Sequence, residues 1–120
     1  MIEQHQLGQD GEGWAEDYLQ RRGYEILGKN LRSHFGEIDL VAKKKDRLYF
    51  VEIKTRSDNS YGSPLEAISE RKKHKIRKTA QFLLLKNPLW RKLIPFFSVL
   101  AIEKDEENRP KFEFLEDAFI

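Results

Sequence analysis

The segment at residues 96–102 constrains the fold most, because nearly every position in it is apolar. A strand with apolar side chains on both faces has to be covered on both sides, as in the interior of an α/β sheet. Residues 8–22 and 69–86 are the candidate covers, since small and apolar residues recur in each at every third or fourth position. The sequence therefore predicts a sheet with helices packed against it.

Further strands are indicated by alternating, β-branched and aromatic residues between turn signals. A chain of 120 residues has the length of one domain. We expect a single α/β domain over residues 1–120, with a mixed β-sheet flanked by α-helices in the order α-β-β-β-α-β-β. A short helical turn is also expected at residues 63–66, where Ser-Pro-Leu-Glu has the form of a capping box. The remaining predicted strands are residues 24–31, 37–43, 47–55 and 111–115.

The second and third predicted strands are separated only by a polar turn at residues 44–46, so they should pair as an antiparallel hairpin. In the first of these two strands, period-2 alternation predicts that Ile38, Leu40 and Ala42 share one face. Glu37, Asp39 and Val41 are expected on the opposite face.

Several classes of protein are excluded by composition. The sequence has no cysteine, which rules out disulfides, thiolate zinc sites and a cysteine nucleophile. Its first residues have neither the basic start nor the apolar stretch of a signal peptide. Its longest apolar run, residues 93–102, has half the length of a membrane span. We therefore expect a cytoplasmic protein with no membrane partner.

Charge is distributed unevenly, although the formal net charge is only +2. Residues 71–92 contain nine Lys or Arg and no Asp or Glu, and residues 103–117 are mainly acidic. Arg71, Lys75 and Lys78 line the polar face of the second predicted helix, with Lys72 at its border. Such a stripe can bind phosphates of a nucleic acid, or it can be an ordinary solvated helix face.

The candidate catalytic and metal-binding residues lie mainly on the predicted hairpin. Glu52 and Lys54 leave the same face of one strand, and pairing would bring them near Asp39 on its neighbour. Glu12, at the edge of the apolar arc of the first helix, could lean over the same end of the sheet. These three carboxylates and the Ile53 backbone carbonyl would suit Mg²⁺, with Mn²⁺ as a substitute. Lys54 could then orient the attacking water or stabilise a phosphoryl oxyanion.

The pattern of Asp39 followed by Glu52-x-Lys54 is that of the PD-(D/E)xK nucleases. By itself it has a simpler explanation, because exposed cross-strand ion pairs are common in charged chains and contribute little. Arg56 continues the same face, where a phosphate contact and a surface charge are equally compatible with the sequence.

Longer stretches carry a resemblance: GQDGEGWAEDYL at residues 8–19, GYEIL at 23–27, GEIDLVA at 36–42 and FVEIKTR at 50–56. In order and spacing they resemble the YraN-like bacterial family, which is related to archaeal Holliday-junction resolvases. With later matches at Gly62, Glu66, Ala67, Lys72 and Ala80, the resemblance covers about residues 7–102. It implies the restriction-endonuclease-like fold and a nuclease site at Glu12, Asp39, Glu52 and Lys54. One departure is Ser98, where that family usually has an aspartate.

The sequence thus predicts a Mg²⁺-dependent endodeoxyribonuclease that cuts phosphodiester bonds in branched or structured DNA, DNA being favoured over RNA. A homodimer with two symmetric sites would suit a four-way junction. The alternative is a non-catalytic nucleic-acid-binding module that keeps the fold and the basic residues Arg56, Arg71, Lys72, Lys75 and Lys78. A third possibility is a protein-interaction domain whose charges are only surface.

Overall fold

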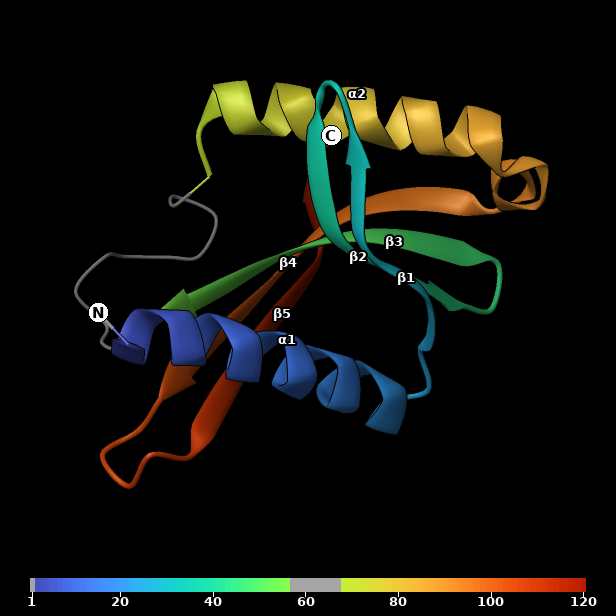
Figure 1. The fold of residues 1–120 in the computed structure, drawn as a ribbon. Coiled ribbons are helices and arrows are strands. Elements are labelled where there is room, and N and C mark those ends of the chain that lie inside the picture. The colour runs from blue at the N-terminus through green and yellow to red at the C-terminus, as the bar shows by residue number, and fades with distance from the viewer. Residues whose placement is uncertain (1, 57–67) are drawn as a thin grey trace.

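The computed structural model describes residues 2–56 and 68–120, with side chains from residue 11 onward. Its elements follow the predicted order (Figure 1). Helix α1 is followed by a three-stranded antiparallel meander, then by helix α2 and the last two strands. The bounds are α1 Ile2–Arg21, β1 Glu25–Ser33, β2 Gly36–Lys44, β3 Arg47–Arg56, α2 Glu70–Lys86, the short 3₁₀ helix η2 Pro88–Lys92, β4 Ile94–Lys104 and β5 Pro110–Phe119.

The five strands form one mixed sheet in the order β1-β2-β3-β4-β5. All neighbours are antiparallel except β3 and β4, which run parallel. A parallel pair needs a crossover connection, and α2 supplies it on one face of the sheet while α1 covers the other (Figure 1). No described helix is both long and apolar enough to cross a membrane.

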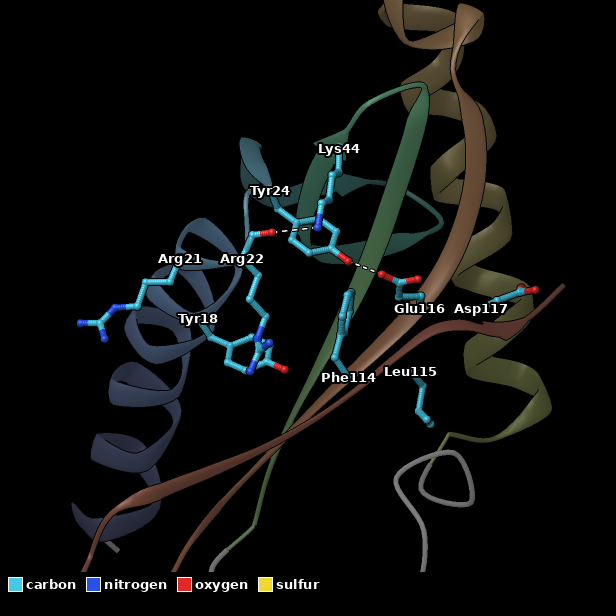
Figure 2. A pocket seen from close by; sticks show the side chains of 9 residues that line it. All are labelled: Tyr18, Arg21, Arg22, Tyr24, Lys44, Phe114, Leu115, Glu116 and Asp117. Carbon is cyan, nitrogen blue, oxygen red and sulfur yellow. Dashed lines mark hydrogen bonds between the residues drawn. The ribbon is translucent and has the colours of Figure 1, made fainter.

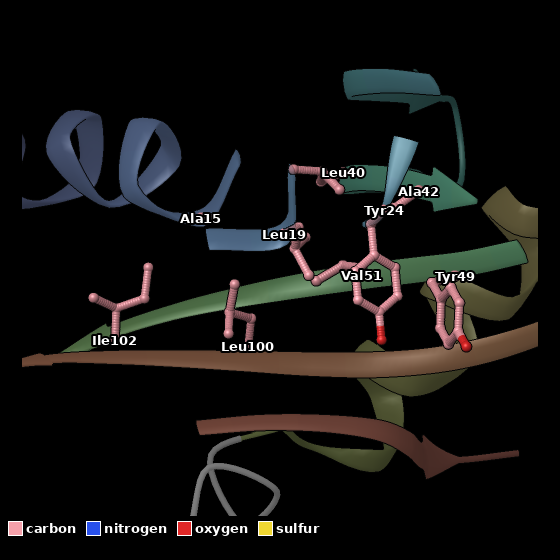
Figure 3. Close-up of a cluster of buried hydrophobic side chains, with 9 residues drawn as sticks. All are labelled: Ala15, Leu19, Tyr24, Leu40, Ala42, Tyr49, Val51, Leu100 and Ile102. Carbon is pink, nitrogen blue, oxygen red and sulfur yellow. The ribbon is translucent and has the colours of Figure 1, made fainter. Parts of the chain in front are cut away.

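The sheet carries an apolar cluster on each face. On the α1 face, Ala15 and Leu19 pack on side chains from the central strands, including Val51 and Leu100 (Figure 3). On the α2 face, Ile76, Ala80 and Leu83 pack on the opposite side chains of β2 and β3. Residues 98–102 of β4 are all buried, which confirms the strand with two covered faces.

Several boundaries differ from the sequence prediction. Helix α1 begins at Ile2 and not at residue 8, and each predicted strand is longer than expected, although β1 begins one residue later. Helix η2 was not anticipated: Asn87 ends α2 through two hydrogen bonds to the Leu83 carbonyl, and Pro88 then starts a tighter turn. The capping box predicted at residues 63–66 lies outside the described residues.

The predicted alternation in β2 is wrong at Ile38. Ile38 packs in the α2-side cluster, whereas Leu40 and Ala42 pack in the α1-side cluster. The physical reason is a bend in the β1–β2 hairpin. Asp39 and the residue opposite it, Asn30, are not paired in the ladder between β1 and β2. Asn30 has a left-handed φ of 51°, which interrupts the extended backbone at this point.

Candidate functional site

Asp39 lies where β2 separates from β3. The ladder between the two strands runs from Lys44–Arg47 to Leu40–Val51. One position further on, the Asp39 carboxylate accepts a hydrogen bond from the Ile53 backbone N–H, with Oδ2 at 2.8 Å from the nitrogen. The side chain thus takes the place of a backbone acceptor, and this holds a carboxylate against β3.

Glu52 is the buried acid of the site. Its side chain is only 5% exposed, and Oε1 lies 2.9 Å from Nζ of Lys72 and 3.8 Å from Nζ of Lys54. Leu48 and Phe50, at the same alternation on β3, pack in the α2-side cluster. Glu52 and Lys54 therefore continue an apolar face of β3, as the sequence predicted, and the structure shows that α2 packs on this face.

The two carboxylates are electrostatically coupled. Burial and the nearby charge of Glu52 raise the pKa of Asp39 to about 7, against the opposing effect of its hydrogen bond from Ile53. Burial disfavours the charged form of Lys72, but its hydrogen bond to Glu52 and its attraction to Glu52, Asp39 and Glu37 leave its pKa above the ordinary value. Two carboxylates thus lie close together at this point, with the ammonium groups of Lys72 and Lys54 beside Glu52.

Glu12 does not join this group. It is exposed on α1, and within the described residues no three His, Asp or Glu side chains are arranged to hold a metal ion. Its neighbour Gly11 packs directly on β3: a Cβ on Gly11 would lie 2.3 Å from Cγ2 of Thr55. Helix α1 therefore approaches the end of β3 next to Lys54, and a ligand role for Glu12 and for the Ile53 carbonyl stays a prediction.

The predicted nucleic-acid contacts fall into three environments. Arg71, Lys75 and Lys78 are exposed on α2, as a phosphate-binding stripe requires. Lys72 is instead directed to Glu52, so it belongs to the site itself. Arg56, expected as a phosphate contact or an exposed charge, is buried with 8% of its surface accessible.

The place of Lys72 in the site was missed from the sequence, where it was assigned only to the helix border. A signal was present, because Lys72, Ile76 and Ala80 follow one another at intervals of four and the last two are buried. A cation that continues a buried stripe needs an anionic partner in the sheet beneath. Glu52 is that partner.

Ser98, the departure from the family pattern, has a structural partner. Its buried hydroxyl donates to the Glu116 carbonyl at 2.5 Å, where the β4–β5 ladder shifts register between Phe97 and Val99. A carboxylate could not donate this hydrogen bond when ionised. The serine therefore closes an irregularity between two strands.

An open cleft of about 770 Å³ lies between the end of α1 and β5 (Figure 2). Its cations already have partners: the Lys44 ammonium donates to the Arg22 carbonyl at 2.8 Å and lies over the Tyr24 ring, and the Arg22 guanidinium lies over Tyr18. The Tyr24 hydroxyl donates to the Glu116 carboxylate. These contacts fasten the helix end to the sheet. The lining residues are Tyr18, Arg21, Arg22, Tyr24, Lys44, Phe114, Leu115, Glu116 and Asp117.

Comparison with known proteins adds a family. The sequence profile described as "Uncharacterised protein family UPF0102" matches residues 11–102, which include every described residue of the site. A UPF0102 protein of Clostridium botulinum is 46% identical over 96 residues, covering 80% of this chain and 78% of that protein. A UPF0102 protein of Clostridium acetobutylicum is 39% identical over 112 residues, covering 93% and 92% respectively. The chain belongs to the UPF0102 family.

Proposed function

We propose that this protein is a Mg²⁺-dependent endonuclease that hydrolyses phosphodiester bonds in DNA, on a fold of the restriction-endonuclease-like type. The observation that carries the proposal is the pairing of two carboxylates, Asp39 and Glu52, with a lysine two residues further along β3. Both acids are withdrawn from solvent and repel each other, which raises the pKa of Asp39. A hard divalent cation relieves such repulsion and prefers oxygen ligands.

Asp39 and Glu52 would hold the ion, which when bound would neutralise phosphate charge and lower the pKa of an attacking water. The Asp39 carboxylate is already oriented by the Ile53 N–H, so little ordering is left for ligand binding. Lys54 is half-buried beside Glu52, where its ammonium can donate to the water or to a phosphoryl oxygen. Lys72 pairs with Glu52 from the side of α2 and so brings a second cation to the site.

The substrate class follows from α2. Arg71, Lys75 and Lys78 are exposed on the helix whose Lys72 reaches the site, so a backbone bound along α2 would lead into it. Phosphate contacts of this kind give affinity without sequence preference. We therefore propose that the protein selects its DNA substrate by shape and acts on branched DNA in the cytoplasm. A symmetric homodimer would place two sites on a four-way junction.

Cleavage of labelled duplex, flap and junction DNA with and without Mg²⁺ tests the proposal. Lys54→Ala should lower the cleavage rate by about two to four orders of magnitude with little change in DNA affinity. Asp39→Asn should lose Mg²⁺-dependent cleavage, and Asp46→Asn, an exposed acid in the β2–β3 turn, serves as the matched control. Wild-type protein that binds these DNAs but cuts none in Mg²⁺ or Mn²⁺ would exclude the enzyme.

A non-catalytic nucleic-acid-binding module is the second candidate. The observation that favours it is the ion pair of Glu52 with Lys72, since a lysine can neutralise the acid without any metal. The two functions differ in their response to Mg²⁺. In the binding module, Mg²⁺ only screens phosphates and weakens DNA binding, whereas in the nuclease it also binds the protein alone.

A further inference from the structure

The β1–β2 hairpin ends in a two-residue turn, His34 and Phe35, that is fastened to α2. Ser33 and Gly36 pair across the turn, and the Phe35 N–H donates to Ser33 Oγ at 3.0 Å. The Ser33 hydroxyl also lies 3.2 Å from the Thr79 hydroxyl of α2. Figure 1 shows this hairpin rising from the sheet to lie across α2.

Close backbone packing fixes the turn further. A Cβ on Gly36 would lie 3.4 Å from Cβ of Lys75 and 3.5 Å from Oγ1 of Thr79, so the strand and helix are nearly in contact. The Thr79 hydroxyl in turn donates to the Lys75 carbonyl. The turn is thus held at a defined position on the basic helix.

The turn presents the only Phe, Tyr or Trp that is exposed in the part of the chain with described side chains. Phe35 is 39% exposed, whereas its counterparts elsewhere in those residues are buried or half-buried. The ring centroids of His34 and Phe35 lie 4.0 Å apart and the ring planes are tilted by 36°, so the two side chains pack on one another as one aromatic unit. An aromatic surface among exposed cations is suited to stacking on a nucleobase while the phosphates bind the cations.

We propose that His34 and Phe35 form a wedge that stacks on the last base pair of a DNA duplex where the duplex ends at a branch, with its phosphates on Arg71, Lys75 and Lys78. Away from its two ends, an uninterrupted duplex offers no exposed base face to such a surface. The wedge would therefore select branched DNA. The position of the cut that we derive from it rests on the proposed nuclease function.

The structure also sets the spacing from the wedge to the site. From Gly36 to Asp39 is three residues of strand, or ~10 Å at ~3.3 Å per residue. From Lys72 to Thr79 along α2 is seven residues, or ~10 Å at ~1.5 Å per residue. Base pairs are stacked at ~3.4 Å, so the cut should fall about three nucleotides from the branch.

Binding is measured first without Mg²⁺, in EDTA, so that the result does not depend on cleavage. The ratio of Kd for an uninterrupted duplex, closed by a loop at each end, to Kd for a three-way branch with its arms closed in the same way gives the preference. Phe35→Ala should lower this ratio about 5- to 150-fold, the range for loss of one stacked base, and Phe35→Trp should retain it. Lys75→Ala should weaken both DNAs equally, and Leu89→Ala, an apolar side chain 73% exposed on η2, should change neither.

Cleavage in Mg²⁺ is measured second, with the cut position mapped on end-labelled branches. A wild-type cut about three nucleotides from the branch that scatters in Phe35→Ala supports the wedge. Loss of the binding preference in Phe35→Ala without any cleavage by wild type supports the wedge and refutes the nuclease. An unchanged preference in a folded Phe35→Ala, or wild type that binds both DNAs alike or neither, overturns the wedge.

Discussion

Replacing Lys72 by methionine tests the electrostatic balance of the site most directly. Methionine keeps most of the apolar stem and removes only the charge. The ammonium that is lost lies 2.9 Å from a Glu52 carboxylate whose side chain is 5% exposed, and the Lys54 ammonium, 3.8 Å away, remains. The substitution therefore removes the closer of these two cations from a buried anion.

The size of the effect follows from these distances. Removing one partner of a buried ion pair typically costs ~3–5 kcal/mol, because the other charge stays buried and uncompensated. Here the Lys72 side chain is 46% exposed and Lys54 remains, so the pair is screened and partly replaced. We expect Lys72→Met to lower the free energy of unfolding by about 1–3 kcal/mol at neutral pH.

Urea unfolding of Lys72→Met beside Lys75→Met provides the assay. Lys75 is exposed on the same helix, so its substitution should cost under ~0.5 kcal/mol. Combining Lys72→Met with Glu52→Gln in a double-mutant cycle isolates the pair, and Glu52→Gln should remove most of the cost. Equal costs at the two lysines, or a coupling energy near zero, would refute the argument.

The same variant reports on the ion. If Asp39 and Glu52 bind Mg²⁺, removing the competing ammonium should tighten Mg²⁺ binding by about tenfold, as ~1.4 kcal/mol corresponds to a factor of ten. Titration of the protein alone with Mg²⁺, followed by calorimetry or by the rise in Tm, measures this. A Tm that responds to Mg²⁺ identically in wild type, Lys72→Met and Asp39→Asn would exclude binding at these carboxylates.

Three further predictions concern the pH dependence of stability, the close approach of α1 to β3, and the hydrogen bond of Tyr24 in the cleft. Because the folded-state pKa of Asp39 is raised to about 7, its contribution to the free energy of unfolding is largest below pH ~4 and is lost as the pH rises through 7. Across that window wild type should lose about 2–4 kcal/mol of stability relative to Asp39→Asn. Urea midpoints measured against pH test this. Gly11→Ala should destabilise by ~1–3 kcal/mol through its clash with Thr55, and Gly13→Ala, with nothing within 4 Å, should stabilise by up to ~1 kcal/mol; equal thermal shifts would contradict the close packing. Tyr24→Phe should cost ~0.5–1.5 kcal/mol, since it removes the hydrogen bond that the phenol donates to the Glu116 carboxylate, and an unchanged urea midpoint would argue against that hydrogen bond.

The arrangement of elements could be predicted because each local pattern agreed with its tertiary surroundings. The apolar segment at residues 96–102 favoured an interior strand, and β4 is buried on both faces at residues 98–102. Glu52 and Lys54 share a strand face with Leu48 and Phe50, and the sequence therefore predicted that this face is inward and opens into the site. The packing of Leu48 and Phe50 and the Glu52–Lys54 contact agree with that prediction. Period and polarity suffice where a segment is regular.

Side chains at the ends of regular patterns were harder to predict. Lys72 and Arg56 are both charged residues at the end of an apolar stripe, where the sequence allows either solvent or a buried partner. Which of these occurs depends on how far the opposing element extends. Here α2 passes over Glu52, and that crossing is a long-range contact with no local signature.

The bend at Asp39 is the reason that the alternation predicted for β2 is wrong, and it also creates the site. The β2–β3 ladder stops at Leu40, yet β3 continues beside β4 as far as Arg56, so the β2-facing edge of β3 is left open beyond Val51. The Asp39 carboxylate caps that edge at Ile53 and is held beside Glu52 as a result. One side chain thus has a structural role through its hydrogen bond and a chemical role through its charge. Asp39→Asn keeps an oxygen acceptor for the backbone N–H and removes only the charge, whereas alanine would remove both, so the asparagine variant is the one that separates the two roles.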